Sequence, residues 1–447
     1  MPFLVALGGL SLLLAAGLGL RLALPVLGRL LLPVSLIGGF VGLAAGPYGA
    51  GLVPGETMAV WTALPAILIN FVFACLFLGA AVPSPRAIVR VGGPLVRFSL
   101  IGALGQYAVG LALTWLVLTP LFGTSALFAC LIEVGFSGGH GTASAMAAVF
   151  AGFGFPAGAA LGQMAATIGL VVGVLGGVAL IQRGVRRGDT TQIAAAGLGD
   201  LPRDTSGLVA PEARRPIAMG TIRTEVLEPF TLHVAVAALA VLVGWGLLIG
   251  IRALHPSLQG FPLFPLAMVG GMLLQVLAVR VGIANWFDRA TFQRITGLAL
   301  DLLVVAAVAS MRLDLVLENV VPFALLMGAA IVWVVGTFLW LGPRLLPADW
   351  FEQAIVVYGT QTGVAAAGLM LLRIVDPQQR TTAAQAFAAR SMVMSPLLGG
   401  GLITATMPLL VQQFGVRQML AATTAAMVLC YVWPGRGRAA AIPRETG

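Results

Sequence analysis

The sequence predicts an all-α polytopic membrane protein with two inverted-topology repeats of five spans, a re-entrant loop in each repeat and one extra C-terminal span. Three observations support this fold class. Hydrophobic residues make up 59% of the 447 residues and charged residues only 9%, too few to solvate the surface of a soluble protein. Apolar runs long enough to span a bilayer recur from end to end. Each half of the chain also contains one apolar segment that glycine and polar residues interrupt.

Thirteen apolar stretches are considered as spans, because a span needs about 20 residues. They lie near residues 4–20, 30–53, 59–82, 98–120, 124–150, 160–181, 229–251, 262–279, 295–311, 320–341, 351–372, 384–411 and 418–434. Two of them, 124–150 and 351–372, are rich in glycine and hydroxyl residues and are interpreted as re-entrant, which leaves eleven full spans. The first stretch lacks a basic n-region, so it is predicted to be a span and not a cleaved signal peptide.

The positions of the arginines predict the orientation, because cytoplasmic loops carry an excess of basic residues. With the N-terminus outside and neither interrupted segment crossing, 21 of the 25 arginines lie in cytoplasmic loops and 3 in outside loops. A full crossing by either segment would remove this bias. The C-terminus is therefore expected in the cytoplasm. The net charge is +9, but the arginines are scattered singly between apolar runs, so nucleic-acid binding is not expected.

One long polar stretch, 183–228, is predicted to be a flexible cytoplasmic linker. It separates an N-terminal repeat, residues 1–182, from a C-terminal repeat, residues 229–415. Residues 416–447 form the extra span and a cytoplasmic tail.

The two halves show the same order of events. Leu32–Gly39 in the first half is similar to Phe264–Gly271 in the second. Each is followed by a span that ends in a basic loop, another span, an interrupted segment and a glycine-rich span. Because each half has five spans, the second half enters from the opposite side of the membrane, and the repeats are inverted.

The interrupted segments are the candidate site. Glycine at this density costs about 1 kcal/mol per residue in a helix, and irregular backbone at membrane depth survives only beside protein or a wet cavity. Such backbone offers carbonyls to a cation and free helix amides to an anion, and hydroxyls replace waters around Na⁺. The alternative is that the glycines only permit close helix packing. The residues of interest are Ser137, Gly138, Gly139, His140, Gly141 and Thr142 in the first segment, and Thr360, Gln361, Thr362 and Gly363 in the second.

Ionisable groups inside spans are functional candidates because they are costly there. Glu133, just before the first loop, is interpreted as a cation ligand, a proton carrier or a partner for an arginine. His140 either contacts substrate or has a structural role. Thr167 and Gln361 are neutral polar groups in or beside the loops.

Two further charges lie in predicted spans. Asp301 is either a Na⁺ ligand or an interfacial residue near Arg294. Arg390 is the one arginine placed at membrane depth. It either supplies the counter-charge to a carboxylate, which guanidinium binds in a bidentate manner, or extends to the cytoplasmic surface.

The first segment resembles the bacterial sodium/glutamate symporters. Ser137–Thr142 looks like the first pore-loop signature of that family, and Ala166–Gly173 and Gln106–Gly110 are similar to its adjoining spans. The resemblance extends from about Pro33 to Leu410 and is looser in the second half. There Gly359–Gly363 departs from the family's Gly-Phe-Gly-Leu-Gly pattern.

The resemblance implies a secondary active transporter of the bacterial inner membrane that couples Na⁺ to uptake of glutamate or a similar acidic amino acid. It also implies a homodimer within membrane lipid, with a fixed scaffold and a moving core, and no cofactor besides Na⁺. Another carboxylate substrate, H⁺ coupling or an ion channel with paired pore loops are the alternatives. Enzyme activity is not expected, because the sequence shows no Ser-His dyad at suggestive spacing and no HExxH motif. Substrate binding is expected at Ser137, Gly138, Gly139, His140, Gly141, Thr142, Thr360, Gln361, Thr362, Gly363 and Arg390, and ion binding at Glu133, Ser137, Thr142, Thr167, Thr360 and Asp301.

Overall fold

The computed structural model describes residues 2–29, 32–80, 92–192, 214, 216–255 and 258–432. These residues form helices and connecting loops, with no strand among them. Within this part of the chain, nine helical stretches are long and apolar enough to cross a membrane. The prediction of an all-helical, multi-pass membrane protein is therefore confirmed. The nine stretches are Pro2–Ala23, Gly55–Ala74, Gly93–Phe122, Gly158–Arg187, Pro229–Leu254, Phe264–Val281, Arg289–Ala309, Val320–Leu345 and Trp350–Val375.

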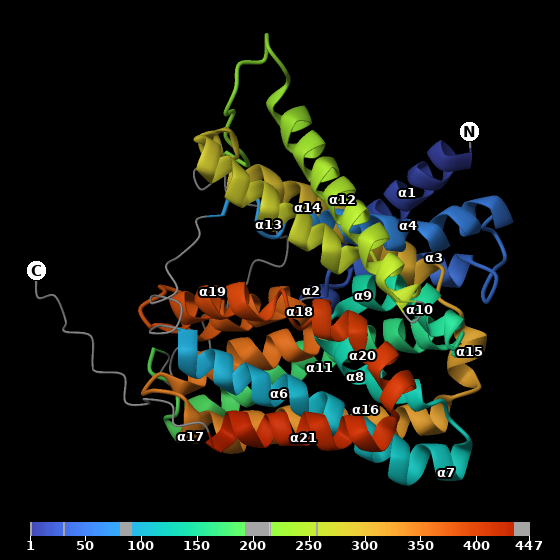
Figure 1. Cartoon of the computed structure of the whole chain (residues 1–447), viewed down its shortest axis with the longest axis vertical. Coiled ribbons are helices and arrows are strands. Elements are labelled where there is room, and N and C mark those ends of the chain that lie inside the picture. Colours follow the sequence, from blue (N-terminus) through green and yellow to red (C-terminus); the bar gives the residue numbers. More distant parts are fainter. Residues whose placement is uncertain are drawn as a thin grey trace, which may run out of the picture.

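The helices form two layers, which lie one above the other in Figure 1. The upper one, called the flanking layer, contains α1 (Pro2–Ala23), α3 (Val34–Ala45), α4 (Gly55–Ala74), α12 (Pro229–Leu254), α13 (Phe264–Val281) and α14 (Arg289–Ala309). The lower one, called the hairpin layer, contains α6 (Gly93–Leu113), α8 (Leu131–Phe136), α9 (Gly139–Ala145), α10 (Ala147–Gly152), α11 (Gly158–Arg187), α16 (Val320–Gly336), α18 (Trp350–Val375), α19 (Ala383–Met394), α20 (Leu402–Phe414) and α21 (Val416–Val432).

Short elements join or extend these helices. They are α2 (Pro25–Arg29), η2 (Thr114–Leu118), α7 (Thr119–Phe122), η3 (Ala126–Cys130), η7 (Ala284–Trp286), α15 (Leu313–Leu317), η8 (Thr337–Leu341) and α17 (Gly342–Leu345). Two of them, η2 and η8, are π-helical turns that continue α6 and α16. Both halves of the chain divide in the same way. The first half gives α1, α3 and α4 to the flanking layer, and the second gives α12, α13 and α14.

Small residues allow the helices of the flanking layer to pack closely. A Cβ placed on Gly244 of α12 would lie 2.5 Å from the backbone N of Ala267 in α13. A Cβ on Gly271 of α13 would lie 2.1 Å from the carbonyl oxygen of Ala74 in α4. Such backbone-to-backbone approach is typical of helix association inside membranes, where van der Waals packing is a main attractive force.

The extra C-terminal helix, α21, runs antiparallel along α6 in the hairpin layer. Arg97 at the start of α6 donates from Nε to the carbonyl oxygen of Cys430 near the end of α21, at 2.8 Å. At the other end of the pair, the guanidinium of Arg417 lies 5.0 Å from the ring centroid of Trp115. This direction agrees with the opposite crossing predicted for spans 98–120 and 418–434.

Two of the eleven predicted full spans are not single long helices in the described residues. Only α3, with 12 residues, forms in the span predicted at 30–53, and it ends where Gly46 and Pro47 begin a glycine-rich turn. The span predicted at 384–411 is divided into α19 and α20 by an irregular segment at 395–401, called the third break. Pro396 and three consecutive glycines favour this interruption.

The linker contacts both layers. Helix α11 continues to Arg187, past the boundary predicted at residue 182. The backbone N–H and the hydroxyl of Thr191 then donate to Oε1 of Glu352 in α18, at 2.7 and 2.9 Å. At the far end of the linker, the Thr221 hydroxyl donates to the carbonyl of Trp286 at 2.7 Å, in the flanking layer. Residues 193–213 of the linker and the tail from 433 lie outside the described residues.

Candidate functional site

The first interrupted segment folds back on itself. Helix α8 stops at Phe136, and α9 starts at Gly139, whose φ of +73° suits glycine. A Cβ placed on Gly162 of α11 would lie 3.0 Å from Cβ of Ala143 and 3.6 Å from Cγ1 of Val134. In a straight helix, residues nine positions apart are separated by about 13–14 Å. Helices α8 and α9 therefore form a hairpin, called the first hairpin, with its tip at 137–139.

The second interrupted segment also reverses. Inside α18 the backbone leaves the helical region at Gly363 (φ −133°, ψ 39°) and Val364 (φ 57°, ψ −179°). A Cβ on Gly359 would lie 2.6 Å from Cα of Gly368, again a pair nine positions apart that a straight helix would separate by about 13–14 Å. Residues 350–362 and 365–375 thus pack side by side. We call them the arms of the second hairpin, with its tip at 363–364.

Helix α11 supports both hairpins along its length. Near its N-terminal end, a Cβ on Gly135 of the first hairpin would lie 2.5 Å from Cβ of Ala165. Near its C-terminal end, a Cβ on Gly184 would lie 2.3 Å from Cε2 of Phe351, at the base of the second hairpin. Between them, the Tyr358 hydroxyl donates to a carbonyl of α11 at 2.8 Å. The hairpins therefore approach each other from opposite ends of α11.

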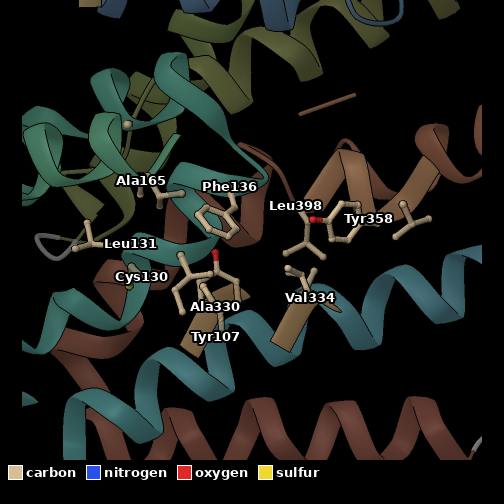
Figure 2. Packing of buried hydrophobic residues seen from close by; sticks show 14 of the residues in the cluster. Tyr107, Cys130, Leu131, Phe136, Ala165, Ala330, Val334, Tyr358 and Leu398 are labelled. Carbon is tan, nitrogen blue, oxygen red and sulfur yellow. The ribbon is translucent and has the colours of Figure 1, made fainter. Parts of the chain in front are cut away.

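The two tips meet near the middle of α11. A Cβ on Gly139 would lie 2.7 Å from Cγ1 of Val364. A Cβ on Gly169 of α11 would touch both hairpins, at 2.3 Å from the carbonyl oxygen of Thr362 and 2.7 Å from Cδ1 of Phe136. Figure 2 shows the apolar cluster in which Phe136 and side chains of α6, α11, α16, α18 and the third break gather. Packed side chains therefore lie beside the meeting of the tips, while Ser137 and Val364 stay partly exposed.

A chain of hydrogen bonds connects the tips. The Ser137 hydroxyl donates to Oε1 of Gln106 at 3.1 Å, and Nε2 of Gln106 donates to the carbonyl of Gln361 at 2.8 Å. Nε2 of Gln361 donates to the carbonyl of Ser99 at 2.8 Å. Nε of Arg390 then donates to the Ser99 hydroxyl at 3.0 Å. Buried Arg390 is therefore joined to both tips through neutral side chains.

Other predicted residues use their hydrogen bonds within the hairpins and α11. Nε2 of His140 and Oγ1 of Thr167 are 2.9 Å apart. Because that hydroxyl already donates to the carbonyl of Gln163, it accepts from His140. The hydroxyls of Thr360 and Thr362 donate to carbonyls of the preceding turn, at 2.7 and 2.8 Å. Both threonines are buried, and their hydroxyls lie against Gly368 and Gly173, respectively.

The third break covers the first tip and was not predicted. Gly399 and Gly400 have φ of +67° and +98°. A Cβ on Gly399 would lie 3.2 Å from the carbonyl oxygen of Ser137, and one on Gly400 would lie 2.6 Å from Oγ1 of Thr142. Three interrupted segments, not two, therefore surround the site.

Glu133 fixes the third break to the first hairpin. It is fully buried, and its Oε1 accepts from the backbone N–H of Gly399 at 2.6 Å and from the hydroxyl of Thr404 at 3.0 Å. Its Oε2 accepts from the hydroxyl of Tyr107 at 2.7 Å. Among the described residues, no arginine donates to Glu133, so of its three expected roles the partner for an arginine is not what the structure shows.

The first tip also lies against the flanking layer. A Cβ on Gly141 would lie 2.5 Å from Cδ1 of Ile69 in α4 and 3.1 Å from Cδ1 of Leu303 in α14. Asp301 precedes Leu303 by two residues, so it lies on another face of α14, where it is exposed. The structure therefore brings together every predicted site residue except Asp301.

Sequence reasoning left five residues that hold the site out of the predicted set: Ser99, Gln106, Tyr107, Gly399 and Thr404. The glycine run that ends at Gly401 was a usable signal for the third break. No comparable signal marks Ser99, Tyr107 or Thr404, because single polar residues in spans are common helix-to-helix contacts.

The site combines hydrogen-bonding groups with groups that can carry charge. It contains hydroxyls, amides, broken-helix backbone, one carboxylate, one guanidinium and one imidazole. Among the described residues, no group of three or more His, Cys, Asp or Glu side chains could hold a metal ion. Compared with known proteins, the chain matches no family model and no curated sequence.

Proposed function

We propose that the chain is a secondary active transporter that moves a small carboxylate across the membrane with a cation. The observation that carries this proposal is the contact between two hairpin tips that arrive from opposite ends of α11, at Gly139 and Val364. Paired broken helices that meet near the bilayer midplane are the substrate and ion sites of many carriers built from inverted repeats.

The arginines favour entry of the hairpins from opposite sides of the membrane. Arg344 precedes the second hairpin, Arg373 lies near the end of its second arm, and Arg380 follows it. The loops at 123–125 and 153–157, which flank the first hairpin, contain no arginine. Under the positive-inside rule, the base of the second hairpin faces the cytoplasm and the base of the first faces outside.

An anionic substrate suits the junction of the tips. The second arm of the second hairpin begins at Ala365, and Ala365 and Ala366 are exposed. Its first backbone amides lack partners within the helix and favour negative charge. Arg390 adds a positive charge nearby, through the hydrogen bonds of Ser99 and Gln361. Glutamate, which the symporter resemblance implies, is the first candidate.

A coupling cation suits the oxygens of the same region. The hydroxyls of Ser137, Thr142, Thr360 and Thr362 lie in or beside the two tips. Together with carbonyls that the breaks release from helical bonding, they resemble the hard ligands that Na⁺ prefers over nitrogen and sulfur. A bound cation would offset the charge of the substrate, which is the physical basis of coupling.

The contact between the two layers favours movement of one against the other. The first tip and the third break contact the flanking layer through Gly141 and Gly400, which face Ile69, Leu303 and Phe73. These contacts are apolar, so sliding would break no hydrogen bond there. We propose that the hairpin layer moves and that the flanking layer forms the fixed scaffold of a homodimer.

Uptake of labelled glutamate into proteoliposomes tests the proposal. We expect accumulation against a gradient when Na⁺ is higher outside, and loss of accumulation when K⁺ replaces Na⁺. Competition by other amino acids and dicarboxylates would define the substrate. Absence of accumulation of every carboxylate under both Na⁺ and H⁺ gradients would contradict the proposal. Unitary conductance in planar bilayers would favour a channel instead.

A further inference from the structure

The environment of Glu133 identifies one more role in this transport cycle. Its carboxyl group is fully buried and accepts from three neutral donors on three elements, namely Tyr107 on α6, Gly399 in the third break and Thr404 on α20. No basic side chain of the described residues bonds to it. A buried carboxyl group without a cationic partner is costly inside a membrane, which marks it as functional.

The arrangement favours a proton over a metal cation at Glu133. An ionised carboxylate has about four lone-pair positions and donates nothing. Three of them face hydrogens, so Na⁺ cannot approach along those directions. A proton takes up almost no volume and needs only one oxygen, so it fits this closed environment.

Protonation would break part of this arrangement. A neutral carboxyl group carries a donor and accepts fewer hydrogen bonds than its ionised form. Gly399 and Thr404 share Oε1, so a proton on that oxygen would leave it too few lone pairs for both donors, whereas the Tyr107 hydroxyl can itself accept from a protonated Oε2. Because Gly399 also lies against Ser137, a weakened contact to Glu133 would release the third break from the first tip.

Few other groups on the surrounding elements could respond to the same pH change. Tyr107 and Cys130 face Glu133, and both are neutral at ordinary pH. His140 bonds to Thr167, and Tyr358 bonds to α11. Helices α16 and α20 carry no titratable side chain, and the charged residues of α6, α11 and α18 lie in their terminal turns.

We propose that Glu133 binds a coupling proton and that its charge determines whether residues 395–401 stay closed on the first tip. This inference rests on the proposed transport function, and it adds the identity of one coupling ion and the segment that the ion controls.

Uptake driven by a pH gradient tests the inference, with equal Na⁺ on both sides of the proteoliposome membrane. Per coupled proton, wild type should accumulate carboxylate about tenfold for each unit of pH that the outside is more acidic. The variant Glu133→Gln, which mimics the neutral form, should lose this accumulation. Glu352→Gln removes another buried carboxylate of the same layer and is the matched control, so it should respond like wild type.

Labelling of the third break provides a readout that does not depend on transport. Ser395→Cys, in a background without the native cysteines, should react with a maleimide faster at acidic pH. With Glu133→Gln the faster rate should persist at every pH. A labelling rate that changes neither with pH nor with Glu133→Gln would overturn the inference. Wild-type uptake that depends on the Na⁺ gradient and does not change with the pH gradient would also overturn the inference, while leaving the proposed transport function intact.

Discussion

Replacement of Gly139 by alanine tests the contact between the hairpin tips. The added methyl group would meet Cγ1 of Val364 at 2.7 Å, in a backbone conformation with φ of +73°. The left-handed conformation costs a non-glycine residue about 1–2 kcal/mol. Overpacking costs about 1–3 kcal/mol. We therefore expect Gly139→Ala to destabilise the protein by about 2–5 kcal/mol and to reduce uptake strongly.

A second variant separates the two contributions. Val364→Ala removes the atom that the new methyl group meets, so it should recover the overpacking part in the double variant and leave the conformational part. Thermal unfolding in detergent, followed by tryptophan fluorescence, measures both. Gly152→Ala is the control, because Gly152 lies on α10 of the same segment and has open space around its Cβ position. The reasoning is refuted if Val364→Ala fails to rescue Gly139→Ala, or if Gly139→Ala is no more harmful than Gly152→Ala.

Three other predictions concern the rest of the molecule. Gln106→Leu should lower stability by about 1–3 kcal/mol in thermal unfolding and abolish uptake. The substitution leaves the buried groups that bond to Gln106 unpaired, including the carbonyl of Gln361. Normal uptake by this variant would refute the proposed hydrogen-bond chain. Asp288→Ala removes the N-cap of α14 and should cost about 0.5–2 kcal/mol. Burial acts to raise the pKa of Asp288, but hydrogen bonds from Thr291 and from backbone amides outweigh it and lower the pKa. The stabilisation by the ionised Asp288 is therefore present at neutral pH and is lost as the pH falls through the lowered pKa. Unfolding curves of wild type and variant across acidic pH would show this loss. Asp301→Asn should leave Na⁺-dependent uptake unchanged. Loss of Na⁺-dependent uptake in this variant would show that Asp301 contributes to the site.

Local composition was sufficient to place the two hairpins in the sequence. Glycines and hydroxyl residues concentrated in an apolar stretch disfavour a continuous helix, and both tips lie inside the predicted segments, at 137–139 and 363–364. The same reasoning should have found the third break. It did not, because the three glycines before Leu402 are neutral in hydropathy, and the surrounding run is apolar enough to be counted as a span.

The contacts between distant segments could not be predicted from composition. Gln106 and Gln361 are 255 residues apart, and nothing local to either one specifies the other. The environment of Asp301 was also undetermined, because the sequence places it on a helix without saying which face meets the hairpins. Glu133 was recognised as costly in a membrane, but its three donors lie on elements whose packing only the fold defines.

The side of the membrane from which each hairpin can be reached tests the central claim most directly. Single cysteines at Ser125 and Pro156 mark the two ends of the first hairpin, and those at Ala348 and Gln378 mark the two ends of the second. In intact cells, a membrane-impermeant maleimide should label both ends of the first hairpin from outside. It should label both ends of the second only after the membrane is opened. Labelling of the two ends of either hairpin from opposite sides would show that the segment crosses the membrane, and the account of two opposed hairpins would be wrong.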